Sequence, residues 1–516
     1  MKFSRHEVNH VWSRTTSWAS QLPGFGHRIS AQKWDLLALG TSVLVPFLLV
    51  SRFDALELSL MFVIVFLGLP LIILTFVRIE WGLAALTFVA YTNAADVAIE
   101  HGVPSPAKIY GITLLIAATL HIIRGYKPIG AGTPALITLI YMLLILASLS
   151  YSDYFRDARE PVINYIREGM ICILMILTLR TGAMFKLLIW SLIIAALFLG
   201  SMNLLQFITG AYWFNFAGFA NAEYDELAKE LGDYRISGPL ADPNFYALIL
   251  LPIVPLCIER LLNEPMRFLR PVAAVTLATV LLAISLTYSR GALIGLVGML
   301  GVALIRIRIP PKALALGLVV MLCVLPFTPN AYITRINDMI ATIAGDKAAS
   351  ETSAADVSVD GRLAEMQVAW RMFTDNPLFG VGAGSYIFNF QSYSQDLHLI
   401  NRGEDRNAHN LYLQIAAERG LIGLAAFGTL LWFMAQSLRR SKHMFQEAGC
   451  YDYGTLATAF STGLVGFLIS SFFLHDSYPK YFWILIGITL SLPQAAQWEI
   501  ARFRRRSLSL QPSLNN

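Results

Sequence analysis

The chain has 516 residues, of which 56% are hydrophobic and 14% charged, and its formal net charge is +5. Soluble proteins carry about 25% charged residues, so this composition, with a mean hydropathy of +0.57, excludes an ordinary soluble protein. Apolar runs of close to 20 residues recur from Leu36 to the C-terminus, and most are long enough to cross a bilayer as helices. The sequence therefore predicts a polytopic membrane protein.

Fourteen candidate spans can be counted from the apolar runs. They fall near residues 36–51, 55–77, 80–98, 106–123, 133–150, 161–180, 187–209, 244–259, 271–288, 291–306, 312–328, 411–438, 455–473 and 481–498. Irregular backbone is not tolerated against lipid, so these spans should be helices. The predicted fold class is an all-α polytopic membrane protein with about 14 transmembrane helices, and a count of twelve or thirteen is the alternative.

Lysine and arginine gather in alternate connecting segments, which by the positive-inside rule places both termini in the cytoplasm. Two long segments then become large periplasmic loops. The predicted order is a cytoplasmic segment 1–35, helices one to seven in 36–209, a loop 210–243, helices eight to eleven in 244–328, a loop 329–410, helices twelve to fourteen in 411–498, and a basic cytoplasmic tail 499–516. Because long loops are often functional, we expect a site to face the periplasm.

The second loop contains two different kinds of sequence. Ala344 to Val359 is rich in Ala, Ser and Asp, which predicts disorder. An amphipathic helix is predicted next. Its apolar positions are Leu363, Met366, Ala369, Trp370 and Phe373.

Cysteine spacing gives no sign of a metal or a cofactor. The four cysteines fit neither a zinc pattern nor a disulfide framework, and the chain has no Asp-x-Asp pair. A His-Glu-x-x-His run occurs once, at residues 6–10, in the polar N-terminal segment. The basic run 502–506 has two interpretations, a nucleic-acid patch or a topology anchor touching anionic lipid. The membrane setting favours the anchor, so no nucleic-acid partner is predicted.

Ionisable residues at membrane depth are functional candidates by default. Arg167 lies in the predicted span 161–180, roughly 9 Å below its outer end at 1.5 Å per residue. The alternative is a structural ion pair with Glu168 or a neighbouring helix. Arg290 lies in a tight re-entry between two spans, at the outer interface, where snorkelling is the alternative.

The run 235–244 is rich in proline and glycine and leads directly into span eight, which predicts a fixed loop at the outer surface. Arg235 is its candidate for a site, whereas Asp242 or Asn244 could simply cap the helix. The glycine run 380–384 fails the dinucleotide pattern because Ser385 occupies the third glycine position, so we expect a loop that needs close backbone approach.

His409 and Asn410 precede span twelve on the same predicted side, although a lone histidine is usually structural. Four arginines share that side of the membrane with this titratable group. They are Arg167, Arg235, Arg290 and Arg362. Guanidinium groups bind phosphate bidentately, so the sequence predicts a metal-free site for a lipid-linked diphosphate.

These residues resemble the O-antigen ligase and O-antigen polymerase superfamily of membrane-embedded glycosyltransferases. The resemblance covers about 210–435. It rests on the run 235–244, Tyr288-Ser-Arg-Gly-Ala292, Gly361-Arg362 with Pro377-Leu-Phe-Gly-Val-Gly382, and His409-Asn410 through Gly420. It implies a multi-pass protein of the bacterial inner membrane, with membrane lipids, a glycan donor on undecaprenyl diphosphate, and a chain-length regulator among its partners.

The resemblance also implies roles for single residues. Arg290 and Arg235 would bind the diphosphate, with Arg167 and Arg362 as further ligands, and His409 would be the general base or would orient the acceptor. Asn244 and Asn410 are candidate supporting residues. Glu418 and Asp242 remain alternative carboxylate bases, which would leave His409 a positioning role.

The acceptor separates two members of this superfamily. A polymerase adds the glycan to another lipid-linked repeat unit, whereas a ligase adds it to lipid A core. Fourteen predicted spans and a long second loop favour an O-antigen or exopolysaccharide polymerase, and a ligase is the alternative. A transporter or flippase for an anionic lipid-linked substrate is the alternative of another class. It would need pocket charges that can be reached from both sides.

Overall fold

The structure is a computed structural model, and it describes residues 68, 70–124, 130–224, 234–240, 242–306, 354–399, 406–475 and 479–509. Almost all of these residues belong to one compact unit that begins at Leu71. The predicted spans 36–51 and 312–328, and most of 55–77, lie outside the described residues.

The described part of the chain is mostly helical. In chain order the helices are α4 (Ile79–Tyr91), α5 (Ala94–Glu100), α6 (Pro106–Ile123), α7 (Gly132–Ser148), α8 (Phe155–Thr178), α9 (Gly182–Thr209), α10 (Pro243–Leu250), α11 (Ile253–Asn263), α12 (Arg270–Leu286), α13 (Arg290–Arg306), α17 (Ala354–Asp375), α18 (Tyr386–Asp396), α19 (Leu411–Glu447), α20 (Tyr451–Ser470) and α21 (Pro479–Ser509). Within the described residues, eight helical segments are long and apolar enough to cross a membrane, and α4 with α5, bent by 63°, would make a ninth. The total of about 14 stays a prediction.

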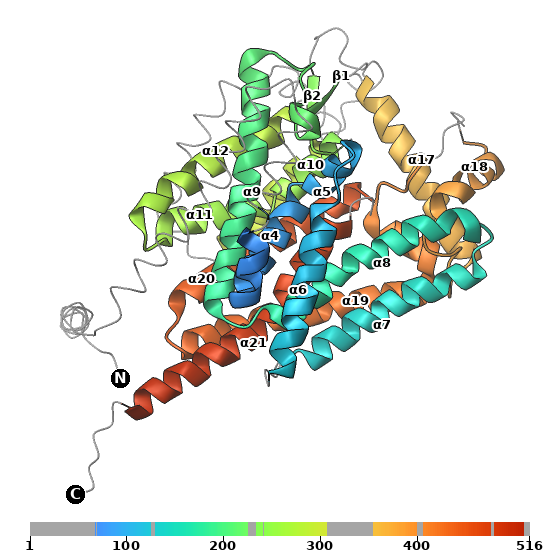
Figure 1. The fold of residues 1–516 in the computed structure, drawn as a ribbon. Coiled ribbons are helices and arrows are strands. Elements are labelled where there is room, and N and C mark those ends of the chain that lie inside the picture. Colours follow the sequence, from blue (N-terminus) through green and yellow to red (C-terminus); the bar gives the residue numbers. More distant parts are fainter. Residues whose placement is uncertain are drawn as a thin grey trace, which may run out of the picture. The chain divides into compact units, whose positions relative to one another are not determined.

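The helices pack as an interleaved bundle in which neighbours in space are often distant in sequence. The last helix, α21, packs along α8 and α19, and α9 packs between α4 and α12 (Figure 1). Small residues allow α13 and α20 to approach closely. A Cβ atom on Gly295 would lie 2.9 Å from the carbonyl oxygen of Gly466, so a larger residue would push these helices apart.

One end of the bundle holds a buried ionic network. The guanidinium of Arg260 is fully buried and bonds the carboxylates of Glu259, Glu264 and Asp452 at 2.6, 2.9 and 2.7 Å. Lys186 joins the network at 3.0 Å from Glu264. These residues come from the start of α9, the end of α11 and the start of α20, so the network fastens three helices where they begin or end.

The opposite end of the same helices carries structure that the all-α prediction missed. The predicted loop 210–243 contains an antiparallel hairpin of β1 (Asn221–Tyr224) and β2 (Tyr234–Gly238). The stacked rings of Tyr212 and Tyr234, 4.6 Å apart, hold the hairpin against the end of α9. Short strands of this kind give too weak a local pattern to stand out beside long apolar runs.

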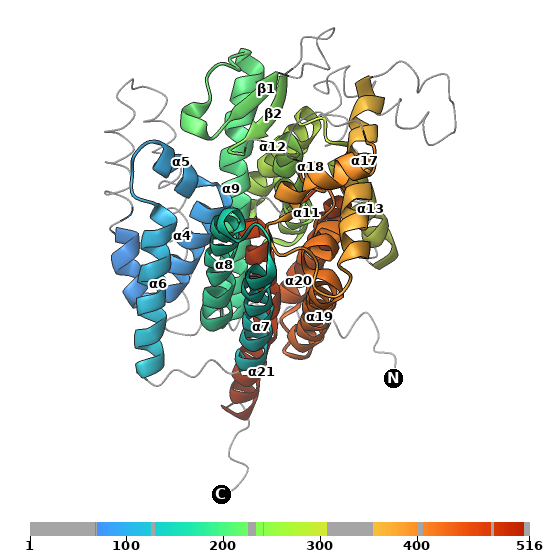
Figure 2. The same ribbon diagram turned by 90° about the vertical axis from the view of Figure 1, so that its right-hand side faces the viewer.

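The predicted loop 329–410 is also more ordered than its composition indicated. Residues 344–353 lie outside the described residues, but 354–359 form the first turns of α17, so the prediction of disorder was wrong there. Figure 2 shows α17 and α18 side by side, next to the start of α19, and these helices pack on one another. Their shared core is Val368, Ala369, Met372, Tyr386, Phe390, Ala408 and Ala417.

The predicted apolar face of α17 is only partly correct. The buried positions are Glu365, Val368, Ala369 and Met372, which follow the spacing of one helical face. Leu363 and Trp370, by contrast, are 54% and 57% exposed. Of the five predicted positions Ala369 is buried, whereas the burial of Val368 and Met372 was not predicted.

Two helix boundaries differ from the predicted spans. The span predicted to begin at Pro161 begins at Phe155, so Arg167 lies twelve residues from the helix start, about 18 Å along the axis rather than 9 Å. At the C-terminus, α21 continues to Ser509 and makes the first part of the predicted tail helical. Polar residues extend both helices beyond their apolar runs, which a span count based on apolarity cannot detect.

The glycine run 380–384 forms the close backbone contact that its composition indicated. The amides of Val381 and Gly382 donate to the carbonyls of Ala417 and Glu418 at 2.9 Å. On the other side, the helix α19 is broken at Gly420, and the amide of Leu421 donates to the carbonyl of Pro377 at 2.8 Å. The run therefore lies directly against the backbone of α19.

Replacing Gly380 by alanine should destabilise the protein. The residue has φ +71°, and a Cβ atom there would lie 2.3 Å from the carbonyl carbon of Glu418, so the substitution adds backbone strain to a steric clash. We expect a loss of about 2–4 kcal/mol. Thermal unfolding in detergent, followed by size-exclusion chromatography, measures it.

Gly428→Ala is the matched control, because Gly428 lies on α19 with open space where the Cβ would be. Its melting temperature should equal or slightly exceed that of the wild type. Equal melting temperatures for Gly380→Ala and Gly428→Ala would show that the contact is not tight.

Candidate functional site

The hairpin and the start of α10 hold the first part of the site. The guanidinium of Arg235, on β2, donates from Nε to the carbonyl of Thr287 at 3.0 Å and from Nη2 to Asn244 Oδ1 at 3.3 Å. Asp242 caps α10, accepting from the amide of Asn244 at 2.6 Å. The capping alternative for Asp242 is therefore observed, and Asn244 orients Arg235.

The second part is the tight turn between α12 and α13. Tyr288 is buried and has φ +53°, a conformation that is uncommon for a residue with a side chain. The turn places Arg290 at the first residue of α13. A Cβ atom on the next residue, Gly291, would lie 2.9 Å from Cβ of Phe473, so this helix start packs against the end of α20.

The third part is a histidine–carboxylate pair, in which Glu365 is buried and His409 is partly exposed. Nδ1 of His409 lies 2.7 Å from Oε2 of Glu365 and 3.1 Å from the carbonyl of Asn407. Both partners are acceptors, so Nδ1 carries the proton and Nε2 is left as the basic nitrogen. His409 also has φ +42°, and such strained positions cluster at functional sites.

Arginines from two segments surround this pair. Arg406 donates from Nη1 to Oε1 of Glu365 at 3.1 Å. Burial lowers the pKa of the Arg362 guanidinium, and the nearby carboxylates of Glu365 and Asp242 oppose that shift. Arg362 is thus within electrostatic reach of both the histidine pair and the cap of α10. It links the first part of the site with the third.

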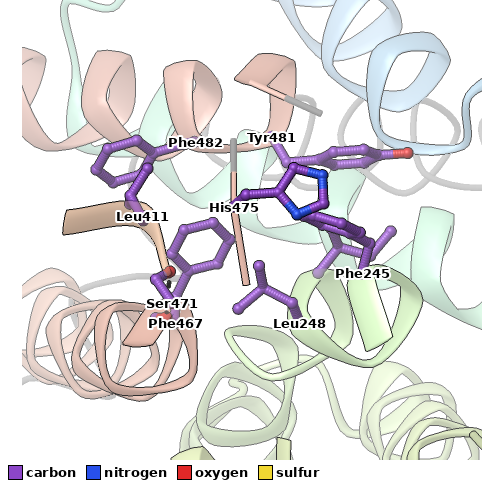
Figure 3. Close-up of a pocket in the computed structure, with 9 residues that line it drawn as sticks. Phe245, Leu248, Leu411, Phe467, Ser471, His475, Tyr481 and Phe482 are labelled. Carbon is purple, nitrogen blue, oxygen red and sulfur yellow. Dashed lines mark hydrogen bonds between the residues drawn. The ribbon is translucent and has the colours of Figure 1, made fainter. Parts of the chain in front are cut away.

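A second histidine, His475, is in contact with His409. The rings of His409 and His475 are 5.0 Å apart, edge to face, and the ring of Phe245 lies 4.9 Å from His475. Burial, and to a smaller degree His409, holds the pKa of His475 well below its usual value, so this imidazole is neutral. Figure 3 shows it in a mostly apolar pocket together with Phe245, Leu248, Leu411 and Tyr481.

The loop that precedes α10, next to Asp242, is held in place by the break between α4 and α5. Asn93 lies at that break with φ +59° and donates from Nδ2 to the carbonyl of Pro239 at 2.8 Å. The buried ammonium of Lys480, at the start of α21, bonds the Asn93 side chain and lies 2.6 Å from Oδ2 of Asp96. The loop before α10 is thereby fixed to two other helices.

Most of the predicted site residues therefore meet at one end of the bundle. The contacts above join Arg235, Asp242, Asn244, Arg362 and His409 directly or through one neighbour. Asn410 is next to His409 and caps α19, accepting from the amides of Tyr412 and Leu413 at 3.0 Å. The turn that leads to Arg290 adjoins the same group, because the carbonyl of Thr287 accepts from Arg235.

Two predicted residues have other surroundings. Arg167 is exposed on α8, and its guanidinium donates to Asn164 of the same helix at 2.9 Å. The carboxylate of Glu168, the alternative ion-pair partner of Arg167, accepts from the backbone amide of Lys480 at 2.8 Å. Glu418 is buried, and it accepts from Gln414 at 3.2 Å and from the amide of Tyr386 at 3.4 Å. Its contacts support the glycine run.

Sequence reasoning missed Glu365 and His475. A signal existed for each: Glu365 occupies the same helical face as Val368 and Met372, and His475 follows a predicted span at the same end as His409. Neither signal is strong, because one carboxylate on a helix and one histidine after a span are common.

The comparison with known families gives a match to part of the chain. Residues 275–428 match the family model described as O-antigen ligase. This segment is similar to the O-antigen ligase family. The match confirms the resemblance to the O-antigen ligase and polymerase superfamily. No curated protein is significantly similar to the chain.

The matched segment, 275–428, contains much of the candidate site. It runs from α12 into α19 and includes Arg290, Arg362, Glu365 and His409. The hairpin and the cap of α10, with Arg235 and Asp242, lie outside it. Together with the long apolar helices, the match identifies a multi-pass membrane protein. The family segment therefore supplies the histidine–carboxylate pair, and the preceding part of the chain supplies a further arginine.

Proposed function

We propose that this protein is a membrane glycosyltransferase that uses a glycan on undecaprenyl diphosphate at the periplasmic face of the bacterial inner membrane. The observation that carries the proposal is the His409–Glu365 pair with Arg406 and Arg362 beside it, next to the group of Asp242, Asn244 and Arg235. A transfer reaction needs both parts, a base for the attacking hydroxyl and cations for the departing diphosphate.

In the proposed reaction the acceptor sugar hydroxyl attacks the anomeric carbon of the donor glycan. The new glycosidic C–O bond forms as the bond from that carbon to the diphosphate oxygen breaks, and the lipid diphosphate leaves with the electron pair. The hydroxyl proton passes to Nε2 of His409. Glu365 holds Nδ1 at 2.7 Å and stabilises the imidazolium that results.

The arginines would stabilise the negative charge of the departing diphosphate. Arg235, Arg290 and Arg362 supply positive charge where two phosphates would depart, and their guanidinium forks suit phosphate oxygens. Within the described residues, no group of three or more His, Cys, Asp or Glu could hold a metal ion. We propose that the arginines do this work without a metal, and Arg167 is the most distant candidate.

The acceptor decides between two activities. The number of predicted spans favours a polymerase that joins O-antigen or exopolysaccharide repeat units. The description of the matching family favours the second candidate, a ligase that transfers the glycan to lipid A core. Both use the same donor and the same base, so the arrangement of charges supports them equally.

Purified protein in proteoliposomes tests the proposal. It is supplied with undecaprenyl-diphosphate-linked repeat units alone, and then with lipid A core as well. A ladder of longer lipid-linked glycans without core indicates a polymerase, and product only in the presence of core indicates a ligase. Intact protein that makes neither product but moves the donor across the bilayer would replace the glycosyltransferase with a flippase.

A further inference from the structure

The helix α17 exposes large apolar side chains on one face. Leu363 and Trp370 are 54% and 57% exposed and lie seven residues, or two turns, apart. The ring of Trp370 contacts that of Phe373 at 5.6 Å, one turn further along. The opposite face is buried on the core shared with α18 and α19. A row of large apolar side chains in water would be costly.

Two more apolar residues follow directly after this helix. Leu378 and Phe379 are 57% and 54% exposed, in the short turn that leads to the glycine run. Hydrogen bonds fix the turn to two candidate membrane spans. The amide of Ile422, on α19, donates to the carbonyl of Leu378 at 3.2 Å, and the hydroxyl of Tyr151 donates to the carbonyl of Phe379 at 2.9 Å.

Those spans expose apolar side chains along their length. On α7 they include Leu136, Leu139, Ile140, Leu143 and Leu146, and on α19 they include Leu421, Ile422 and Trp432. Side chains of this kind on a membrane span face lipid. The aromatic pair of Tyr151 and Phe379, with ring centroids 5.8 Å apart, lies at the end of α7, where aromatic belts meet the headgroups.

Exposed apolar side chains thus occur on α7 and α19, at Leu378 and Phe379 in the turn that is bonded to both, and on the face of α17, the helix that leads into this turn. We propose that this face, defined by Leu363, Trp370, Leu378 and Phe379, is embedded in the headgroup–acyl boundary of the bilayer. Amphipathic helices with such a face lie in the membrane plane. The polar side of α17 then faces water, where Arg371 pairs with Asp375 at 3.2 Å.

Embedding would fix the height of the site relative to the membrane. Glu365 lies on α17, and the same helix carries Arg362 three residues earlier. A helix anchored in the boundary therefore holds the histidine–carboxylate pair at headgroup depth. The position of this face relative to the membrane can be measured without glycan, so its test does not depend on the glycosyltransferase reaction.

Spin labels test the depth of the face. Single cysteines are introduced as Trp370→Cys and Leu378→Cys in a protein whose four native cysteines are replaced by serine, and the labelled protein is reconstituted in vesicles without glycan. Collision with oxygen, which partitions into lipid, and with a water-soluble nickel chelate is then measured. Arg371→Cys on the polar side and Ser392→Cys on α18 are the matched controls, since both residues are exposed.

We expect an oxygen-to-nickel collision ratio at residues 370 and 378 several-fold higher than at residues 371 and 392. Equal ratios at all four positions would place the face in water, as for a surface that binds an acceptor glycan, and would overturn the proposal. Protection from both reagents at 370 and 378 would mean that protein covers the face, which overturns it as well.

Discussion

His409→Ala is expected to lower glycan transfer by about 10²–10⁴-fold, the usual contribution of a general base. The substitution removes Nε2, the nitrogen that would take the hydroxyl proton, and leaves Glu365 with Arg406 as its partner. The protein should still insert and fold, because Asn410 and not His409 caps α19. The measurement is the rate of product formation in proteoliposomes, with the amount of membrane-inserted protein determined in parallel.

His398→Ala is the matched control. His398 lies in the same segment, is exposed, and also has a positive φ, of +54°. Its replacement should leave transfer unchanged. Glu365→Gln should fall between the two, because the amide oxygen can still accept from Nδ1 but no longer stabilises a charged imidazolium.

Wild-type transfer by His409→Ala would remove the histidine from the mechanism. A carboxylate would then have to serve as base. Glu418 supports the glycine run and Asp242 caps α10, so Glu365 would become the first residue to test.

Arg290→Lys is expected to lower transfer by about 10²-fold although the positive charge is kept, as when one donor to a developing anion is lost. A lysine ammonium is a point charge and cannot replace a planar fork that holds two phosphate oxygens. Arg290 starts α13 against the end of α20, so its position is set by a tight helix contact. Initial rates at several donor concentrations measure the effect.

Arg371→Lys is the control for this substitution. Arg371 is exposed on α17 and pairs with Asp375, so its exchange for lysine should leave the rate unchanged. Unchanged turnover by Arg290→Lys would contradict a diphosphate clamp at this residue and leave snorkelling as its role. Arg235→Lys would then be the next variant to test. Reduced transfer would indicate a diphosphate clamp at Arg235, and unchanged transfer would speak against a clamp there as well.

The helices of the membrane domain were largely predictable, because their signal is local. A run of about 20 apolar residues is long enough to cross the bilayer as a helix, and this does not depend on which other segments pack against it. The predicted spans from 80–98 to 291–306 and from 411–438 onward all coincide with described helices, with shifted ends. The exceptions are features with weak local signals: the hairpin, the early start of α8 and the helical turns at 354–359.

The site was predictable in part, for a similar reason. Arg235, Arg290 and His409 occur in short motifs at the ends of spans, so the sequence alone could assign them to one side of the membrane. It could not pair His409 with Glu365, because the two lie 44 residues apart and meet only when α17 folds back on the start of α19. Arg167 was selected for its predicted depth in the membrane, yet its hydrogen bond is to Asn164 in its own helix.

The sequence by itself determined that the chain crosses a membrane many times and carries arginine and histidine motifs of the O-antigen ligase kind. Only the tertiary structure decided which of these residues meet, which carboxylate orients the histidine, and which face of α17 is exposed. The physical reason is the range of the interactions. Apolarity and helix spacing act within one segment, whereas a hydrogen bond of 2.7 Å between distant segments exists only once the chain has packed.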